Sequence, residues 1–268
     1  MKIGKKEFDT EHKTYVMGIL NVTPDSFSDG GNWNELDKAL AHTQQMIEEG
    51  AAIIDVGGES TRPGYTKISD EEEIDRVTPI IRAIHERFDI PVSIDTYKSK
   101  VAEAAVQAGA DLVNDIWGLK YDDRMADVIA QYQVSCCLMH NKNKAEYNDF
   151  VSDMISETLE STHIALGAGV AKDKIILDPG VGFGKTYEMN LAAIRHLDKL
   201  CAQGYPVLLG CSRKSVIGNT LKLPVDERIE GTLVTTVMAV LSGCAFVRVH
   251  DIKENVRTIK MAEAIKRS

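Results

Sequence analysis

The stretch PVSIDTYKSKVAEAAVQAGADLVNDI, from Pro91 to Ile116, contains one strand–helix–strand unit and indicates the class of the fold. It begins with the apolar run PVSID and closes with DLVND. Nearly continuous apolar runs of this length are typical of strands buried on both faces of a parallel sheet. Between them, small apolar residues recur at helical spacing from Lys98 to Ala108, and Gly109 ends the predicted helix directly before the second strand.

The same alternation continues over the whole chain. Eight candidate strands begin at Tyr15, Ala52, Pro91, Asp111, Ser135, Lys174, Pro206 and Ala245. Helical patterns lie between them, the clearest over 36–49, 98–108, 149–166, 189–202, 229–241 and 253–265. Eight such units in 268 residues favour an α/β fold of the (β/α)8 barrel type, for which about 250 residues is usual. An open doubly wound sheet is the alternative, but the strand count and the lack of a linker favour a single barrel domain over residues 1–268.

The composition excludes several classes of protein. With 44% hydrophobic and 26% charged residues the chain can bury a large core, so it is not disordered or fibrous. The net charge of −9 argues against nucleic-acid or anionic-membrane partners, so an anionic ligand must meet a local group of cations. The five cysteines include no C-x-x-C pair, which predicts reduced thiols, no zinc site and a cytoplasmic location. No stretch has the pattern of a signal peptide or a membrane span.

Polar residues follow almost every predicted strand, at the end of a barrel where active sites are built. They are Asn21, Asp55, Asp95, Asn114, Asp115, His140, Asp178, residues 212–214, Arg248, His250 and Asp251. We interpret Asp55 and Asp115 as ordinary turn or helix-cap residues. Asp95, Asn114 and Asp178 are different as a set, because two carboxylates and an amide converging on a barrel mouth suit a planar heterocycle with amino and ring N–H groups.

Cations gather at the last two strands, where this fold often binds phosphate. Lys214, Arg248 and His250 lie there, and Arg62 can reach in from the loop after the second strand. Arg248 stands between two valines in an apolar strand, so an inward guanidinium must meet an anion. An internal ion pair with Asp95 or Asp178 is the alternative to a bound phosphate.

Four stretches that contain glycine invite functional interpretations. TPDSFSDGG at 23–31 and GGESTRPG at 57–64 are long for strand-to-helix loops, and we interpret them as mobile lids over a substrate. DPGVGFGKT at 178–186 resembles a phosphate-binding loop, but Pro179 and Lys185 break the Walker and dinucleotide patterns. GCSRK at 210–214 lacks the second glycine of a hydrolase nucleophile elbow.

Seven motifs, taken together and in order, resemble the dihydropteroate synthases of folate biosynthesis. They are GILNVTPDSFSDGG at Gly18, DVGGESTRPG at Asp55, SIDTYK at Ser93, VNDI at Val113, LDPGVGFGKT at Leu177, SRKS at Ser212 and RVHD at Arg248. The resemblance covers nearly the whole chain. It implies a transferase on a (β/α)8 barrel, assisted by Mg²⁺ and usually a homodimer. The reaction would join 6-hydroxymethyl-7,8-dihydropterin diphosphate to 4-aminobenzoate, giving 7,8-dihydropteroate and diphosphate, and sulfonamides would act as mimics of the aminobenzoate.

The resemblance also assigns roles to individual residues. Asp95, Asn114 and Asp178 would contact the edge of the pterin, Lys214 its carbonyl side, and Arg248 with His250 the diphosphate. Asn21 would act through the metal, Phe183 would pack beside the aminobenzoate, and Thr61, Arg62 and Ser212 would complete the two substrate sites. Asp95, Lys214, Arg248 and Asp178 are the expected catalytic residues. Cys211, Val216 and Trp117 depart from the family pattern, which concerns affinity for aminobenzoate and sulfonamides more than the reaction.

The expected chemistry is a dissociative displacement. Loss of diphosphate from the pterin methylene leaves a delocalised cation, so the site must neutralise the leaving group and place carboxylates near the ring. We also expect Ser212 to lie where a helix begins, with backbone N–H groups suited to the aminobenzoate carboxylate. Two other functions would use the same pterin contacts: methyl transfer from a reduced folate to a corrinoid protein, and pterin binding without catalysis. Neither needs the full set of cations.

Overall fold

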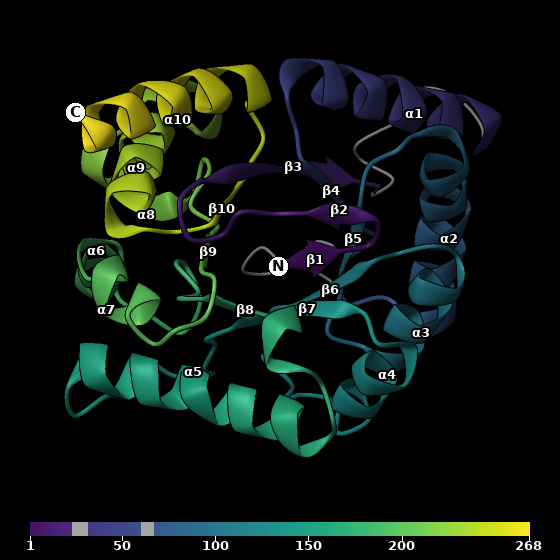
Figure 1. The fold of residues 1–268 in the computed structure, drawn as a ribbon, viewed down its shortest axis with the longest axis horizontal. Coiled ribbons are helices and arrows are strands. Elements are labelled where there is room, and N and C mark those ends of the chain that lie inside the picture. The colour runs from purple at the N-terminus through teal and green to yellow at the C-terminus, as the bar shows by residue number, and fades with distance from the viewer. Residues whose placement is uncertain (23–31, 60–66) are drawn as a thin grey trace.

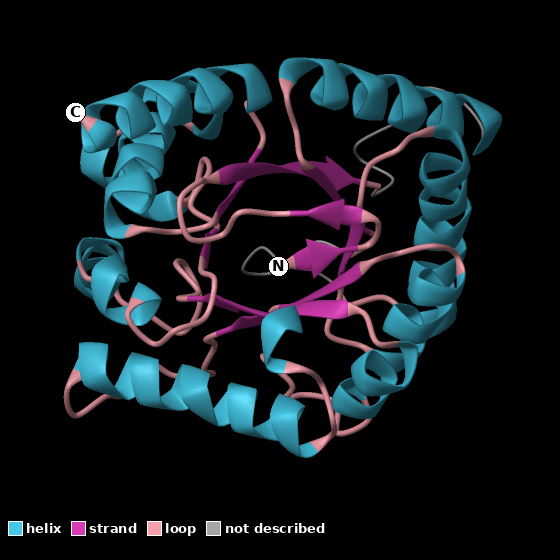
Figure 2. Ribbon diagram, in the orientation of Figure 1, coloured by secondary structure: helices cyan, strands magenta, loops and turns pink. Residues whose placement is uncertain are grey.

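The computed structural model describes residues 1–22, 32–59 and 67–268. Eight parallel strands form one sheet in the order β8-β7-β6-β5-β4-β3-β10-β9, and a parallel bridge between Leu177 and Val207 brings β8 beside β9. The sheet therefore closes into the predicted barrel, with the helices outside it (Figures 1 and 2). The strands are β3 (Tyr15–Asn21), β4 (Ile53–Gly57), β5 (Val92–Asp95), β6 (Leu112–Asp115), β7 (Ser135–Met139), β8 (Ile175–Asp178), β9 (Leu208–Leu209) and β10 (Phe246–Val249). All eight predicted strands are confirmed.

The helices follow the prediction with three additions. They are α1 (Asn32–Glu49), α2 (Asp70–Arg87), α3 (Ser99–Gln107), α4 (Met125–Tyr132), α5 (Phe150–Gly167), α6 (Tyr187–Arg195), α7 (Leu197–Cys201), α8 (Ser215–Leu221), α9 (Ile229–Ser242) and α10 (Ile252–Arg267). The sequence pattern did not indicate α2, α4 or α8. Ser69 caps α2 and four acidic residues fill its first turn, although Pro79 lies in its interior. The helix predicted over 189–202 is two helices, divided at His196.

The interior of the barrel has two chemically different layers. The side chains that alternate with outward-facing ones along each strand point inside. The lower, apolar layer consists of Met17, Ile53, Leu112, Cys137, Ile176, Leu208 and Phe246. Two residues further along the same strands stand Asp55, Asn114, Asp178 and Arg248. The same alternation therefore produces a packed core below and a polar layer at the carboxyl ends of the strands.

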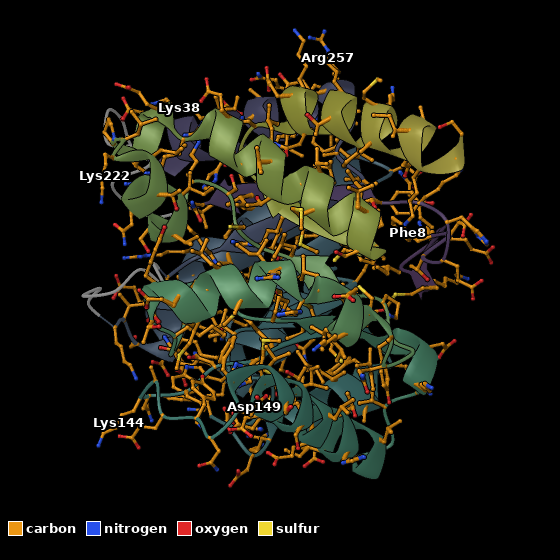
Figure 3. All side chains as sticks on the ribbon, turned by 90° about the vertical axis from the view of Figure 1, so that its left-hand side faces the viewer. Phe8, Lys38, Lys144, Asp149, Lys222 and Arg257 are labelled. Carbon is orange, nitrogen blue, oxygen red and sulfur yellow. The ribbon has the colours of Figure 1, made fainter. Side chains whose placement is uncertain are left out.

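A short antiparallel hairpin, β1 (Lys2–Ile3) with β2 (Lys6–Glu7), covers the amino-terminal end of the barrel (Figure 1). Ile3 is fully buried in the lower layer, and the ring of Phe8 contacts those of Tyr15 and Phe246 edge-on. In the side view, Phe8 lies at one end of the molecule, whereas Lys144 and Lys222, which follow β7 and α8, lie toward the other (Figure 3). None of the described helices is both long and apolar enough to cross a membrane.

Candidate active site

The register of the sheet places four residues at one level near the carboxyl ends of the strands. Asn21 is opposite Gly57, Gly57 is opposite Asp95, and Asp95 is opposite Asn114. Gly57 lies between the side chains of Asn21 and Asp95: a Cβ on this glycine would lie 3.6 Å from Asn21 Oδ1 and 3.8 Å from Asp95 Oδ2. Asp95 and Asn114 are buried, while Asn21 is exposed. The structure therefore brings Asn21, Asp95 and Asn114 to one level at the mouth of the barrel.

Arg248 crosses the barrel and joins two carboxylates. Its Nε donates to Asp55 Oδ2 at 2.5 Å and its Nη2 to Asp95 Oδ2 at 2.6 Å. Asn114 Nδ2 also donates to Asp55 Oδ2, at 3.2 Å. The internal ion pair considered as an alternative for Arg248 is present, with Asp95 as one partner. The interpretation of Asp55 as a turn residue is wrong, since its side chain is fully buried among the polar groups of the site.

Strand alternation is the signal that distinguishes Asp55 from Asp115. Asp55 lies two residues after Ile53, a member of the inner apolar layer, so its side chain also points inside. Asp115 lies two residues after Val113, which belongs to the outer core, and it accepts the backbone N–H groups of Trp117 and Leu119. The turn interpretation therefore holds for Asp115 alone.

A second pair of opposite charges consists of Asp178, at the end of β8, and Lys214, directly before α8. A Cβ on Gly210 would lie 3.5 Å from Asp178 Oδ2 and 3.9 Å from Lys214 Nζ, so both groups surround this glycine. Lys214 Nζ donates to the carbonyl of Val181 at 2.5 Å and lies 4.8 Å from the centre of the Phe183 ring. The structure thus brings Asp178, Lys214 and Phe183 together with Arg248.

Burial shifts the pKa of most of these groups. It raises the pKa of Asp95 to about 7, against the opposing charge of Arg248, and the nearby carboxylate of Asp55 adds to the rise. It also raises the pKa of Asp178, with Lys214 opposing, and lowers the pKa of Lys214, with Asp178 opposing. For Arg248 the effect of burial is outweighed by the carboxylates of Asp55 and Asp95, which raise its pKa.

Two carboxylate oxygens of the site are buried without a hydrogen-bond partner in the described part of the chain. They are Asp55 Oδ1 and Asp95 Oδ1, each on a carboxylate whose other oxygen binds Arg248. A buried acceptor without a donor is costly, and such atoms are rare in native proteins. The polar layer therefore holds two unsatisfied acceptors, both enclosed within the protein.

Ser212 and His250 form a pair beside this cluster. Ser212 Oγ lies 3.0 Å from His250 Nδ1 and accepts the backbone N–H of His250 at 3.3 Å. The helix expected at Ser212 begins three residues later, at Ser215, so the expectation that Ser212 lies at a helix N-terminus is wrong. Arg213 in the left-handed conformation intervenes, and its guanidinium pairs with Asp251.

Comparisons with known proteins agree with this arrangement. The model of the pterin-binding enzyme family matches residues 17–250. A dihydropteroate synthase of Clostridium beijerinckii is 60% identical over 268 residues, covering 100% of both chains. The chain belongs to the dihydropteroate synthase family. A solved dihydropteroate synthase of Clostridium difficile, in the presence of pteroic acid, is 49% identical with a TM-score of 0.95, covering 98% of this chain and 100% of that one. The Yersinia pestis synthase in a sulfonamide complex is 40% identical with a TM-score of 0.93, covering 100% and 99%.

Some residues that the family resemblance singles out lie outside the described part of the chain. Thr61 and Arg62 are among them, as are the 23–31 stretch and residues 60–64 of the second predicted lid. Within the described ranges, no three His, Cys, Asp or Glu side chains are grouped so that they could hold a metal ion. Membership of the dihydropteroate synthase family thus rests on the match along the whole chain. The described part of the site consists of residues from strands β3 to β10 and from the loops after β5 to β10.

Proposed function

We propose that this chain is a dihydropteroate synthase that joins 6-hydroxymethyl-7,8-dihydropterin diphosphate to 4-aminobenzoate and releases diphosphate. The observation that carries the proposal is the buried Arg248 bridge between Asp55 and Asp95, with one unpartnered oxygen on each carboxylate. The bridge places carboxylates, which can accept hydrogen bonds from a heterocycle, beside the guanidinium of Arg248, which can bind an anionic leaving group. The relative that is 60% identical along its full length bears this name.

In this proposal the pterin ring lies over the polar layer. Asp95, Asn114 and Asp178 contact its amino and ring N–H groups, and Lys214 donates to its carbonyl side. The side chains of Asp95, Asn114 and Asp178 support the assignment, because they are largely buried, each offers an acceptor oxygen, and a pterin supplies N–H donors. Burial of these carboxylates strengthens every charged hydrogen bond that forms there.

The diphosphate is assigned to Arg248, His250 and Ser212. Arg248 donates hydrogen bonds from Nε and Nη2 to its two carboxylates. Its Nη1 carries two more N–H groups, which can donate hydrogen bonds to oxygens of the diphosphate. Ser212 and His250 are already paired, so a contact to one orients the other. Asn21, with an exposed side chain at the end of β3, would hold Mg²⁺ together with the diphosphate.

The residues present suit that metal. Mg²⁺ takes oxygen ligands, usually keeps several waters, and is bound together with substrate phosphates and not by an all-protein cage. The single amide oxygen of Asn21 agrees with this. When bound, Mg²⁺ would neutralise charge on the leaving diphosphate.

The second substrate, 4-aminobenzoate, is assigned to the side of the site formed by Phe183. The Phe183 ring packs against the apolar cluster of Tyr97, Ile116 and Met139, and Trp117 packs against the same cluster. An aromatic ligand can stack on such a surface. Thr61 and Arg62 are proposed to complete this side.

The proposed mechanism is a dissociative displacement. Arg248 and His250 stabilise the charge that develops on the departing diphosphate, while Asp95 and Asp178 lie near the positive charge that develops in the ring. The amine of 4-aminobenzoate then attacks the methylene carbon. A pair of unit charges at about 4 Å is worth about 4 kcal/mol at the effective dielectric of a partly enclosed site, so the buried layer contributes more than surface charges would.

Diphosphate release tests the proposal. We expect release from the pterin diphosphate only when 4-aminobenzoate and Mg²⁺ are present, with dihydropteroate as the other product. Arg248→Ala is expected to lower kcat by at least about 100-fold, since it removes a charge that acts in the transition state. Lys222→Ala, on the surface after α8, serves as the control and should leave kcat unchanged. Pterin binding without release would support a binding protein, and methyl transfer to a corrinoid acceptor would support the methyltransferase.

We also propose that the chain is a single domain over residues 1–268 that forms a homodimer in the cytoplasm. The five free cysteines support a reducing compartment. Helices α9 and α10, which pack on each other, expose Val234, Leu241, Met261 and Ile265, and an apolar surface of this kind suits contact with a second copy. Sedimentation analysis should give the mass of a dimer, and Val234→Glu should shift it to that of a monomer.

A further inference from the structure

Lys185 lies near the end of the loop between β8 and α6, residues 179–186, and its ammonium group donates hydrogen bonds to backbone carbonyls of the same loop. Its Nζ lies 2.9 Å from the carbonyl oxygens of Gly180 and Phe183 and 2.9 Å from His140 Nδ1. The carbonyl of His140 is a weaker fourth partner at 3.3 Å. A lysine ammonium has three N–H groups, so the three shorter contacts use all of them.

His140 is fixed from its other side. It is 3% exposed at the end of β7, and its Nε2 lies 2.8 Å from Glu157 Oε2. Burial lowers the pKa of His140 to about 4, so the imidazole is neutral near pH 7. Nε2 then carries the proton that Glu157 accepts, which leaves Nδ1 as the acceptor for Lys185. Lys142 Nζ donates to the second oxygen of Glu157 at 2.7 Å.

The chain of contacts Glu157–His140–Lys185 therefore ends on the loop that carries Phe183. The loop also packs closely against His140, the residue that follows β7, because a Cβ on Gly180 would lie 1.9 Å from the carbonyl oxygen of His140. From the side of the site, Lys214 Nζ donates to the carbonyl of Val181 and faces the Phe183 ring. The same short loop is thus held by Lys185 from within and by Lys214 from the site.

We propose that Lys185, supported by His140 and Glu157, is a positioning residue for the second substrate: it sets the loop conformation in which Phe183 stands beside Lys214. This inference rests on the proposed function, in which Phe183 packs beside 4-aminobenzoate. Lys185 itself touches neither substrate. Its effect should be larger on the aminobenzoate side, because Phe183 lies within the loop, whereas the pterin is also held by Asp95 and Asn114 on β5 and β6, outside the loop.

Lys185→Met tests the proposal, since methionine keeps the length of the side chain and removes the three donors. We expect the KM for 4-aminobenzoate to rise about tenfold, while the KM for the pterin diphosphate changes by less than about threefold. Burial lowers the pKa of Lys185 to about 7, so the assays are run at pH 6, where the ammonium predominates. An equal rise in both KM values would show a general structural loss and overturn the proposal.

Lys142→Met is the matched control. It removes a lysine that shares Glu157 as a partner but makes no contact with the carbonyls of Gly180 or Phe183. Both KM values should stay near those of the wild type, because Glu157 keeps its hydrogen bond to His140 when Lys142 is replaced. In a double variant with Phe183→Ala, Lys185→Met should cause no further rise in the KM for 4-aminobenzoate, because its effect passes through Phe183. Additive effects would contradict the proposal.

Two further measurements cover other outcomes. If Lys185→Met does not fold, Glu157→Gln should give the same selective rise in smaller measure, by weakening the hold on His140. Amide hydrogen exchange across residues 180–186 should be faster in either variant than in the wild type, a readout that needs no catalysis. A wild-type chain that forms no dihydropteroate would refute the proposed function, whereas unchanged exchange in the variants would refute the role of Lys185.

Discussion

At the scale of single residues, the face of the strand on which a carboxylate lies decides whether it belongs to the candidate active site. The sequence places both Asp55 and Asp115 at the ends of strands, although Asp55 follows Ile54 and Asp115 follows Asn114. Asp55 faces the interior and binds Arg248, whereas Asp115 faces outward and closes a turn through two backbone N–H groups. Because successive side chains of a strand point to opposite faces, a shift of one position along the strand moves a side chain from the site to the outer surface of the barrel.

Asp55→Asn is expected to lower kcat/KM for the pterin diphosphate by about 10- to 100-fold, since a hydrogen bond to a charged group contributes roughly 1.5–3 kcal/mol. The substitution also removes one of the two anions that orient Arg248. Steady-state kinetics with the pterin diphosphate varied would measure the effect. Asp115→Asn is the control: it should lower the melting temperature while leaving kcat/KM close to that of the wild type. A similar kinetic loss in both variants would argue against a role for Asp55 in the site.

The raised pKa of Asp95 predicts opposite effects of pH on activity and stability. Burial raises that pKa to about 7, so the acceptor form required by the pterin gains population as the pH rises. Activity limited by this group should be about tenfold lower at pH 6 than well above pH 7. Because the folded pKa exceeds the unfolded value, the contribution of Asp95 to folding is full below about pH 4 and is lost as the pH rises through 7.

Urea unfolding of the wild type and Asp95→Asn at several pH values would test the stability part. We expect the difference in unfolding free energy between the two to move in favour of Asp95→Asn as the pH rises from 4 to 7. A difference that stays constant over this range would show that Asp95 has the same pKa in both states.

At the scale of elements, the loop between β8 and α6 shows how glycines permit close packing. Gly180, Gly182 and Gly184 all have positive φ, at 66°, 92° and 54°. These conformations bring the backbone of the loop against β7 on one side and under Lys214 on the other. The glycines of DPGVGFGKT therefore serve tight packing and the placement of Phe183, and the stretch has neither the Walker nor the dinucleotide pattern.

Gly180→Ala should destabilise the fold by more than about 2 kcal/mol, because its Cβ would lie 1.9 Å from the carbonyl oxygen of His140. Gly169→Ala provides a control with a similar backbone cost. Gly169 also has positive φ, at 95°, but a Cβ there has nothing within 4 Å, so only about 1–2 kcal/mol of strain is expected. Urea unfolding of the two variants would measure the difference, and equal losses would mean that the contact with His140 relaxes at no cost.

At the scale of the whole molecule, the two ends of the barrel have separate tasks. The amino-terminal end is closed by Ile3 and Phe8 over an apolar layer, and the carboxyl end holds the charged groups. Stability and chemistry are therefore spatially divided, as is usual for this architecture.

Phe8→Ala should cost about 3–5 kcal/mol of stability, as other large-to-small substitutions in cores do, with both KM values unchanged. Phe8 is 5% exposed and packs on Tyr15 and Phe246 at the far end from the site (Figure 3). Thermal unfolding and steady-state kinetics on the same preparation would separate the two effects. A raised KM for either substrate would show that the two ends are coupled.

The sequence by itself determined the barrel and most of the site. The number and spacing of the apolar runs predicted eight strands, because local hydrophobicity and helix-ending glycines can be recognised from the sequence alone. Asp95, Asn114, Asp178, Lys214 and Arg248 could be proposed from the sequence because they lie near or just beyond the carboxyl ends of predicted strands. Only the tertiary structure decided which anions Arg248 meets, that Asp55 belongs with them, and that Lys185 holds the loop of Phe183. Those facts depend on contacts between residues far apart in the chain, such as Asp55 and Arg248, and the geometry of a closed barrel sets such contacts.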